Sequence, residues 1–350
     1  MITYVEAALN YLSIHHTGNK LQDELFRTSD KPLPIDDENL RRLVMQYFLT
    51  PFEKVNEIYR MHHTSGNLGL NEVYHFATTI FTSPDSFHEN SIQIAKHLWD
   101  VSSHPKIKSG ELYVVYFDDL QIEGVLHQAL GIFKSENKES YLKVGRDDEG
   151  FTLNYEEEAI NIKKLDKGCL IFNTEKEEGY VVAVIDQTNS NEAAYWIDDF
   201  LKLVTRNDSY NQTNNTLSLY KNFITTEGDD EFTISKTDKI DLLNRSIKYF
   251  KEKDHFDMEE FGNEVIGHAE GIESFKTFKK NHEDEYAMEG SDSFAINEAA
   301  VKKQAKSYKS ILKLDKNFHI YIHGDKDLIE KGFDEEKDMN FYKVYFKNEE

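Results

Sequence analysis

The chain contains a single cysteine, Cys169, among its 350 residues. One thiol cannot form an intramolecular disulfide, so a disulfide-stapled fold is excluded, and this usage is typical of a reducing cytoplasm. Cys169 lies in the apolar run 168–172, GCLIF, which favours a buried and unreactive thiol over a nucleophile. We therefore expect a cytoplasmic protein whose cysteine is structural.

Long apolar runs, proline and glycine are also scarce. No stretch approaches the roughly 20 apolar residues that a membrane-spanning helix needs. The first residues include Glu6 and lack the basic segment of a signal peptide. With only 5 Pro and 17 Gly, the chain is not of low complexity, and its 39% hydrophobic and 13% aromatic residues can form an ordered core. We expect no association with membranes.

Positive charge is the third deficit. The chain has 41 Lys and Arg against 64 Asp and Glu, which gives a net charge of −23. Long-range repulsion by this charge opposes the approach of nucleic acid. Electrostatic screening acts over roughly 8–10 Å at physiological salt, however, so local charge decides whether a phosphate can dock.

The first two hundred residues predict a mixed domain. We expect a strand at 9–16, a helix that opens at 36–38 and is interrupted by Pro51, and further helices at 52–63, 71–81 and 86–101. Runs rich in β-branched and aromatic residues predict strands at 111–117, 126–133, 140–144, 151–154, 169–173 and 180–186. The short connections between them require an antiparallel sheet. Residues 192–204 are expected to form an amphipathic helix over one of its faces.

The remainder predicts a second domain. Residues 206–216 are rich in Asn, Asp, Ser and Thr and indicate a linker or long surface loop, which gives domains 1–206 and 207–350. Helices are expected at 217–225, 236–252, 257–266 and 272–285, and strands at 318–323 and 340–346 are expected to pair. The predicted fold class is α+β, with helices and an antiparallel sheet in the first domain and a mostly helical second domain closed by a hairpin-like strand pair.

One stretch near the end of the chain has a positive net charge, unlike the chain as a whole. Residues 301–317 contain six lysines and one acid, Asp315, so the local charge is +5. Val301, Ala305, Tyr308 and Leu312 recur at helical spacing, which predicts a helix that Asn297 could cap. The lysines of this stretch are Lys302, Lys303, Lys306, Lys309, Lys313 and Lys316. They form either a solvated helix face or a cationic stripe that meets phosphate or an acidic partner.

Catalytic patterns are weak. Asp118 and Asp119 end one predicted strand and Glu136 and Lys138 follow the next, and two carboxylates with a lysine are what a metal-dependent nuclease needs. Such polar groups are also common in turns of a chain that is 30% charged. The sequence contains no phosphate-binding loop, no nucleophile elbow, no His-Glu-x-x-His motif and no paired Cys at metal-ligand spacing. We therefore expect no cofactor and no bound metal.

Four motifs carry a resemblance to a known family. They are IFKSE at 132–136, KLDKGCLIFN at 164–173, VKKQ at 301–304 and KLDKNFHIYIHG at 313–324. Together they resemble the bacterial nucleoid-associated protein family, the NdpA-like or 37-kilodalton group, over nearly the whole chain. The resemblance implies a cytoplasmic bacterial protein found with the nucleoid, and the family offers no catalytic motif to carry over.

Three functions remain open. The first is a non-enzymatic nucleoid-associated protein that binds DNA weakly and without sequence specificity through the six lysines of 302–316. The second is an acidic interaction adaptor that a DNA-processing partner recruits to the nucleoid. The third and most remote is the metal-dependent nuclease. The sequence does not indicate an oligomeric state.

Overall fold

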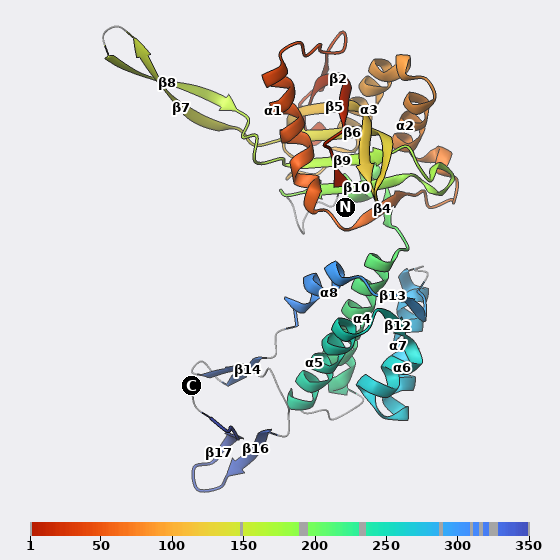
Figure 1. The fold of residues 1–350 in the computed structure, drawn as a ribbon, viewed down its shortest axis with the longest axis vertical. Coiled ribbons are helices and arrows are strands. Elements are labelled where there is room, and N and C mark those ends of the chain that lie inside the picture. Colours follow the sequence, from red (N-terminus) through yellow and green to blue (C-terminus); the bar gives the residue numbers. More distant parts are fainter. Residues whose placement is uncertain are drawn as a thin grey trace. The chain divides into compact units, whose positions relative to one another are not determined.

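The computed structural model divides into two compact units, Met1–Arg206 and Asn207–Glu350, which are described separately. Figure 1 draws their secondary structure. The residues that the structure describes are 2–147, 150–188, 195–230, 236–286, 290–308, 311–314, 318–321 and 328–348. The predicted α+β class is confirmed, since helices and antiparallel strands both form. Within these residues, no helix is both long and apolar enough to cross a lipid bilayer.

The first unit is built on one antiparallel sheet of nine strands. Its path runs β11-β4-β10-β9-β6-β5-β2-β3, and β1 pairs with the end of β5. The strands are β1 (Ile2–Thr3), β2 (Ala8–Thr17), β3 (Arg27–Thr28), β4 (Ile58–Met61), β5 (Gly110–Ile122), β6 (Val125–Ser135), β9 (Lys167–Phe172), β10 (Val181–Asp186) and β11 (Leu203–Thr205). Each pair is antiparallel, as the short connections predicted.

Helices cover both faces of this sheet because its strands are apolar on both sides. Along β6, Leu130 and Ile132 face one buried cluster, whereas Ala129 and Phe133 face the other. The helical elements are α1 (Glu38–Leu49), α2 (Glu72–Thr82), α3 (Phe87–Val101), a π-helical segment (Trp196–Leu201) and short 3-10 turns at Lys20–Gln22, Thr50–Lys54, Leu68–Leu70, Pro84–Ser86 and Lys176–Glu178. Helices α2 and α3 and the π-helical segment pack on the first face, and α1 packs on the second.

The single cysteine lies in the centre of this sheet. Cys169 is on β9, between β6 and β10, and its side chain is fully buried in the first apolar cluster. Burial raises the pKa of the thiol well above its ordinary value. The expected burial of the thiol is therefore confirmed, and the raised pKa disfavours the reactive thiolate.

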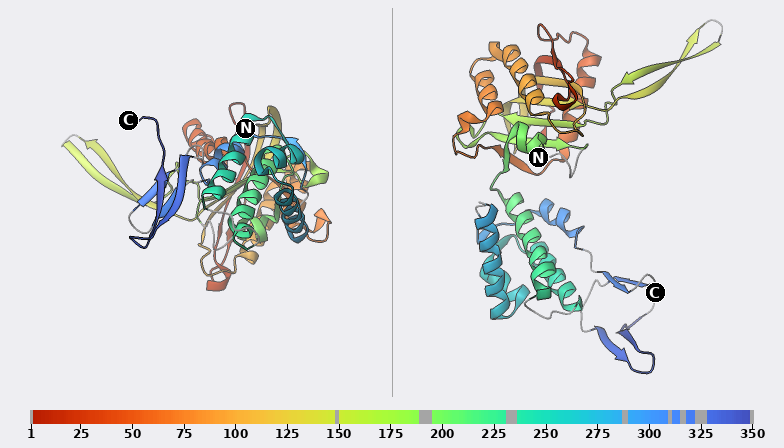
Figure 2. Two further views of the ribbon diagram at one scale, coloured as in Figure 1. Left: turned by 90° about the horizontal axis from the view of Figure 1, so that it is seen from below. Right: turned by 180° about the vertical axis from the view of Figure 1, so that it is seen from behind.

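Two strands of this unit stand apart from the sheet. They are β7 (Glu139–Asp147) and β8 (Gly150–Ala159), which lie between β6 and β9 in the chain and form a separate two-stranded ribbon. Figure 1 and Figure 2 show the ribbon as a long arm that projects from the sheet of this unit.

The second unit is a helical bundle around aromatic side chains. Its elements are α4 (Ser209–Asp230), α5 (Lys236–Glu252), α6 (Met258–Phe261), a π-helical segment (Gly262–Ile266), α7 (Ala269–Tyr286), α8 (Glu298–Ala305), and the paired strands β12 (His255–Asp257) and β13 (Ser293–Ala295). Tyr220 of α4 meets the rings of Phe261 and Phe275 edge to face at 5.0 and 5.1 Å between centroids. Such contacts give the bundle its core.

Three helix and loop predictions are wrong in part. Residues 58–61, predicted to be helical, form β4, whose Ile58 and Met61 are buried between β10 and β11. The predicted linker at 206–216 is helical from Ser209, because Tyr210 and Asn211 are buried in α4. The helix predicted at 192–204 is shorter: it ends at Leu201, and β11 follows. Residues 189–194 lie outside the described residues.

The second unit ends in hairpin-like strand pairs, as predicted, but the partners differ. Strand β15 (Phe318–Tyr321) pairs with β14 (Ile311–Leu314), and β17 (Met339–Val344) pairs with β16 (Ile329–Asp334). The expected pairing of 318–323 with 340–346 is therefore wrong. Each strand instead pairs with its nearest neighbour in sequence, because closing a short loop costs less chain entropy than closing a long one.

Candidate nucleic-acid interface

Helix α8 carries the beginning of the lysine-rich stretch. The Asn297 side chain accepts hydrogen bonds from the backbone N–H groups of Ala299 and Ala300, at 3.0 and 3.2 Å, so the expected N-cap is present. On the inner face, Val301 is buried against the bundle. The Gln304 amide donates to Asn214 and Ser218 of α4, at 2.8 and 2.7 Å. These contacts fix which side of α8 faces solvent.

The helix is shorter than the lysine spacing predicted. It ends at Ala305, and the N–H groups of Ser307 and Tyr308 close tight turns onto the carbonyls three residues before them. The Tyr308 hydroxyl donates to the Leu217 carbonyl of α4, which holds this turn against the bundle. A single helical stripe of lysines is therefore not formed, because tertiary contacts stop the helix and β14 begins at Ile311.

The lysines of this stretch that the structure describes occupy different backbone environments. Lys302 and Lys303 lie on α8, Lys306 caps its end, and all three are exposed. Lys313 lies in β14. Lys309 and Lys316 lie outside the described residues. Among the described lysines, Lys313 therefore shares no helix with Lys302 and Lys303, and their charges are close because the residues are close in sequence.

The side chains of Lys302 and Lys303 on α8 both lie at the surface. Lys302 Nζ lies 3.7 Å from Glu298 Oε2, with 80% and 90% of the two side chains exposed. An ion pair at such exposure contributes little and is screened by salt. Lys303 Nζ lies over the ring of Tyr210, 5.7 Å from its centroid, and the residue is exposed. Both side chains are therefore exposed to solvent.

A further cation joins the group from α4. Lys221 Nζ donates to the Ser307 carbonyl at 3.1 Å and lies 5.8 Å from the centroid of the Tyr308 ring. It thus stands beside the turn that follows Lys306. Lys221 cannot be identified from the sequence, because it is 86 positions from Ser307 and only the packing of α8 on α4 brings the two segments together. The pattern of α4 alone contains no signal for this proximity.

The four residues of the possible nuclease are not brought together. In the register of β5 and β6, Glu111 pairs with Ser135 and Phe117 with Ala129. Asp118 and Asp119 therefore lie roughly 25 Å along the strands from Glu136, since each residue advances a strand by about 3.3 Å. A nuclease site that combines these residues with Lys138 is contradicted by this register. Among the described residues, no three His, Cys, Asp or Glu side chains are grouped to hold a metal ion.

Glu136 instead belongs to a buried polar cluster at one end of the sheet. Its carboxylate lies 3.0 Å from Lys134 Nζ and accepts a hydrogen bond from the Tyr195 hydroxyl at 3.2 Å. On neighbouring strands, Lys167 Nζ donates to Asp186 at 2.6 Å. Burial lowers the pKa of Lys134, and Glu136 opposes this effect. Because the buried charges are paired, the cluster suits a structural role.

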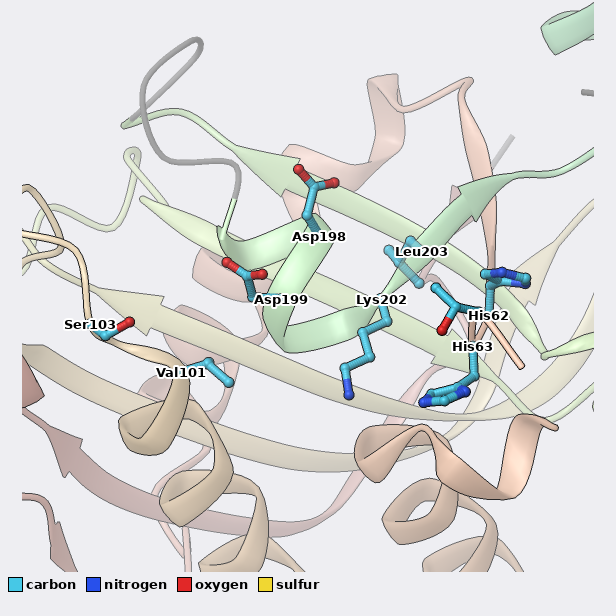
Figure 3. Close-up of a pocket in the computed structure, with 9 residues that line it drawn as sticks. His62, His63, Val101, Ser103, Asp198, Asp199, Lys202 and Leu203 are labelled. Atoms are coloured by element: carbon cyan, nitrogen blue, oxygen red, sulfur yellow. The ribbon is translucent and has the colours of Figure 1, made fainter. Parts of the chain in front are cut away.

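The first unit also has an open pocket of about 630 Å³. Figure 3 shows His62 and His63 on one side of Lys202, and Asp198 and Asp199 on its other side. Burial, followed by the charge of Asp199, raises the pKa of Asp198. Lys202 Nζ is paired with Glu72 at 2.6 Å. This mixture of signs does not favour a phosphate backbone, so the exposed lysines remain the better candidate.

Comparison with known proteins gives one finding. A search of curated proteins finds no match. The family model NA37, described as nucleoid-associated protein YejK, matches residues 13–340. This range includes most of both units and the whole lysine-rich stretch. The chain therefore belongs to the NA37 family of nucleoid-associated proteins.

Proposed function

We propose that this protein is a non-enzymatic nucleoid factor that binds DNA directly, weakly and without sequence specificity. The contact is assigned to Lys302, Lys303 and Lys306, with the other lysines of 302–316. The observation that carries the proposal is the exposure of these three side chains inside a segment of charge +5. Family membership supports an association with the nucleoid, and with it a location in the cytoplasm.

The negative net charge of the whole chain determines the expected affinity for DNA. Electrostatic screening over roughly 8 Å lets the lysine segment act locally, although the remaining surface repels DNA at longer range. If four lysines engage phosphates, log K should fall against log salt with a slope of roughly −3.6. A dissociation constant on the order of 10⁻⁴–10⁻⁶ M at physiological salt is expected for such binding.

The test compares two triple variants in a fluorescence anisotropy titration of a labelled duplex at low salt. Lys302→Glu, Lys303→Glu and Lys306→Glu together should abolish binding. The matched control reverses three exposed lysines elsewhere in the same unit and therefore changes the net charge equally; they are Lys248, Lys251 and Lys280. If both triple variants lose affinity equally, net charge and not this segment governs binding, and the proposal fails.

A second candidate is the acidic interaction adaptor. It is favoured by the charge of both units, since residues 1–206 contain 33 Asp and Glu against 20 Lys and Arg, and residues 207–350 contain 31 against 21. Such a surface suits a basic, DNA-bound partner. Purified protein that leaves DNA unshifted at low salt, yet retains a DNA-processing enzyme in a pull-down, would select the adaptor.

A further inference from the structure

The arm formed by β7 and β8 has one apolar face that faces solvent. In its register, Leu142 is opposite Tyr155 and Val144 is opposite Leu153. These four residues and Phe151 share one face because side chains alternate along a strand. Their exposed fractions are 75% for Leu142, 67% for Val144, 73% for Phe151, 67% for Leu153 and 63% for Tyr155.

A two-stranded ribbon is only marginally stable alone in water, and it gains stability when its apolar face is covered. An aromatic side chain buries roughly 150–250 Å², so the five exposed residues offer on the order of 500 Å² per copy. The largest apolar patch on a typical monomeric protein is of about this size and is often functional. The apolar face of the arm therefore suits the binding of a partner.

Charge argues that the occupant is a protein and not DNA. Residues 139–159 contain seven Asp and Glu against two basic residues, Lys143 and Arg146. A ribbon with this excess of acids would be repelled by phosphates. A second copy of the ribbon carries the same excess, so a contact between copies has to come from the apolar face and not from net charge. The five apolar side chains also present no hydrogen-bonding groups to base edges, apart from the Tyr155 hydroxyl.

The charges at the two ends of the apolar face complement each other. Arg146 lies near the tip, with its guanidinium over the Phe151 ring at 4.7 Å from the centroid. Glu157 lies at the base, two residues beyond Tyr155 on the same strand, and is exposed. If two arms stack face to face in opposite directions, each Arg146 comes near the Glu157 of the second copy. Each Leu153 then packs on the Tyr155 of the second copy.

We propose that the arm is a self-association element, and that its apolar face packs against the arm of a second copy of this chain. The contact is two-fold symmetric, as in most homodimers. Its area is below the roughly 800 Å² per partner of a standard interface, so the dimer is weak and concentration-dependent. The inference is independent of DNA binding, because the arm and the lysine segment share no residue.

Sedimentation velocity on the full chain, between about 1 and 300 µM, tests this proposal. The parent should shift from monomer to dimer over this range. Val144→Thr with Leu153→Thr keeps β-forming residues but removes one apolar rung, and should raise the dimer dissociation constant at least tenfold. The matched control, Lys143→Thr with Asn154→Thr, changes the next rung, on the polar face, and should leave dimerisation unchanged.

A charge exchange gives a second measurement that does not alter the apolar rungs. Arg146→Glu and Glu157→Arg should each weaken the dimer, and the double variant should associate more tightly than Glu157→Arg alone. The proposal is overturned if the parent stays monomeric throughout, if the apolar-rung variant dimerises like the parent, or if the double exchange restores nothing. A parent that stays monomeric but retains another protein through this face would likewise end the self-association proposal.

Discussion

Lys134 Nζ and Glu136 Oε1 lie 3.0 Å apart, and both side chains are closed off from solvent. The two residues are separated by one position where β6 ends, so they share a face. Lys134 also donates to the Lys108 carbonyl at 2.6 Å. The pair is therefore a fixed internal connection between the sheet and the segment that precedes β5.

Removal of one partner of this pair should be strongly destabilising. Lys134→Met leaves the Glu136 carboxylate buried without its cation, at an expected cost of about 3–5 kcal/mol. Lys134→Met with Glu136→Met removes both charges and should cost less than the single change. Urea unfolding measures both. The control is Lys248→Met, which breaks an exposed ion pair and should lower the free energy of unfolding by less than about 1 kcal/mol. If Lys134→Met and Lys248→Met lower it equally, burial of the Lys134–Glu136 pair is unimportant.

Stability should fall in mild acid because of His15. Burial, with a smaller contribution from His88, lowers the pKa of His15 to about 4. Its Nδ1 accepts from the Ser29 N–H at 3.3 Å, so a proton on this nitrogen would break the hydrogen bond. The unfolded chain binds a proton near pH 6.5 and the folded chain does not, so up to roughly 3 kcal/mol is lost as the pH falls from 6.5 to 4.

The measurement for His15 is the free energy of unfolding across this pH range. The slope of the free energy of unfolding against pH gives the number of protons taken up on unfolding. In His15→Gln this number should be lower by close to one, whatever the absolute stability of the variant. An unchanged slope would mean that His15 does not titrate differently in the two states.

Lys221 should contribute to DNA binding although it is remote in sequence from the lysine segment. Lys221→Gln removes one ammonium group beside Ser307, so the salt slope of binding should weaken by about 0.9. Lys248→Gln on α5 is the control and should leave the slope unchanged. Equal slopes for the parent and the Lys221 variant would exclude this residue from the interface.

Gly179 should not tolerate a side chain. It has φ +99°, and a Cβ there would overlap the Met61 carbonyl oxygen of β4. Gly179→Ala should therefore cost more than the roughly 1 kcal/mol expected from left-handed backbone alone. Gly124→Ala is the matched control, since Gly124 has φ +85° and a Cβ there would meet nothing within 4 Å. Thermal unfolding that ranks the two variants equally would contradict a steric role for Met61.

Local patterns predicted much of the fold. The apolar runs at 111–117 and 126–133 lie within β5 and β6, and the helix predicted at 236–252 has the bounds of α5. Prediction failed where a short segment had ambiguous periodicity. Residues 58–61 are a strand because β10 and β11 supply partners on both sides, and no local signal records those partners.

The sequence by itself determined the α+β composition, the antiparallel strands and the local excess of lysine, because periodicity, loop length and charge are properties of neighbouring residues. Only the tertiary structure decided where α8 ends, that Lys221 stands beside it, and that Asp118 and Asp119 are far from Glu136. The reason is physical: helix ends and strand registers depend on packing between segments that are distant in the chain.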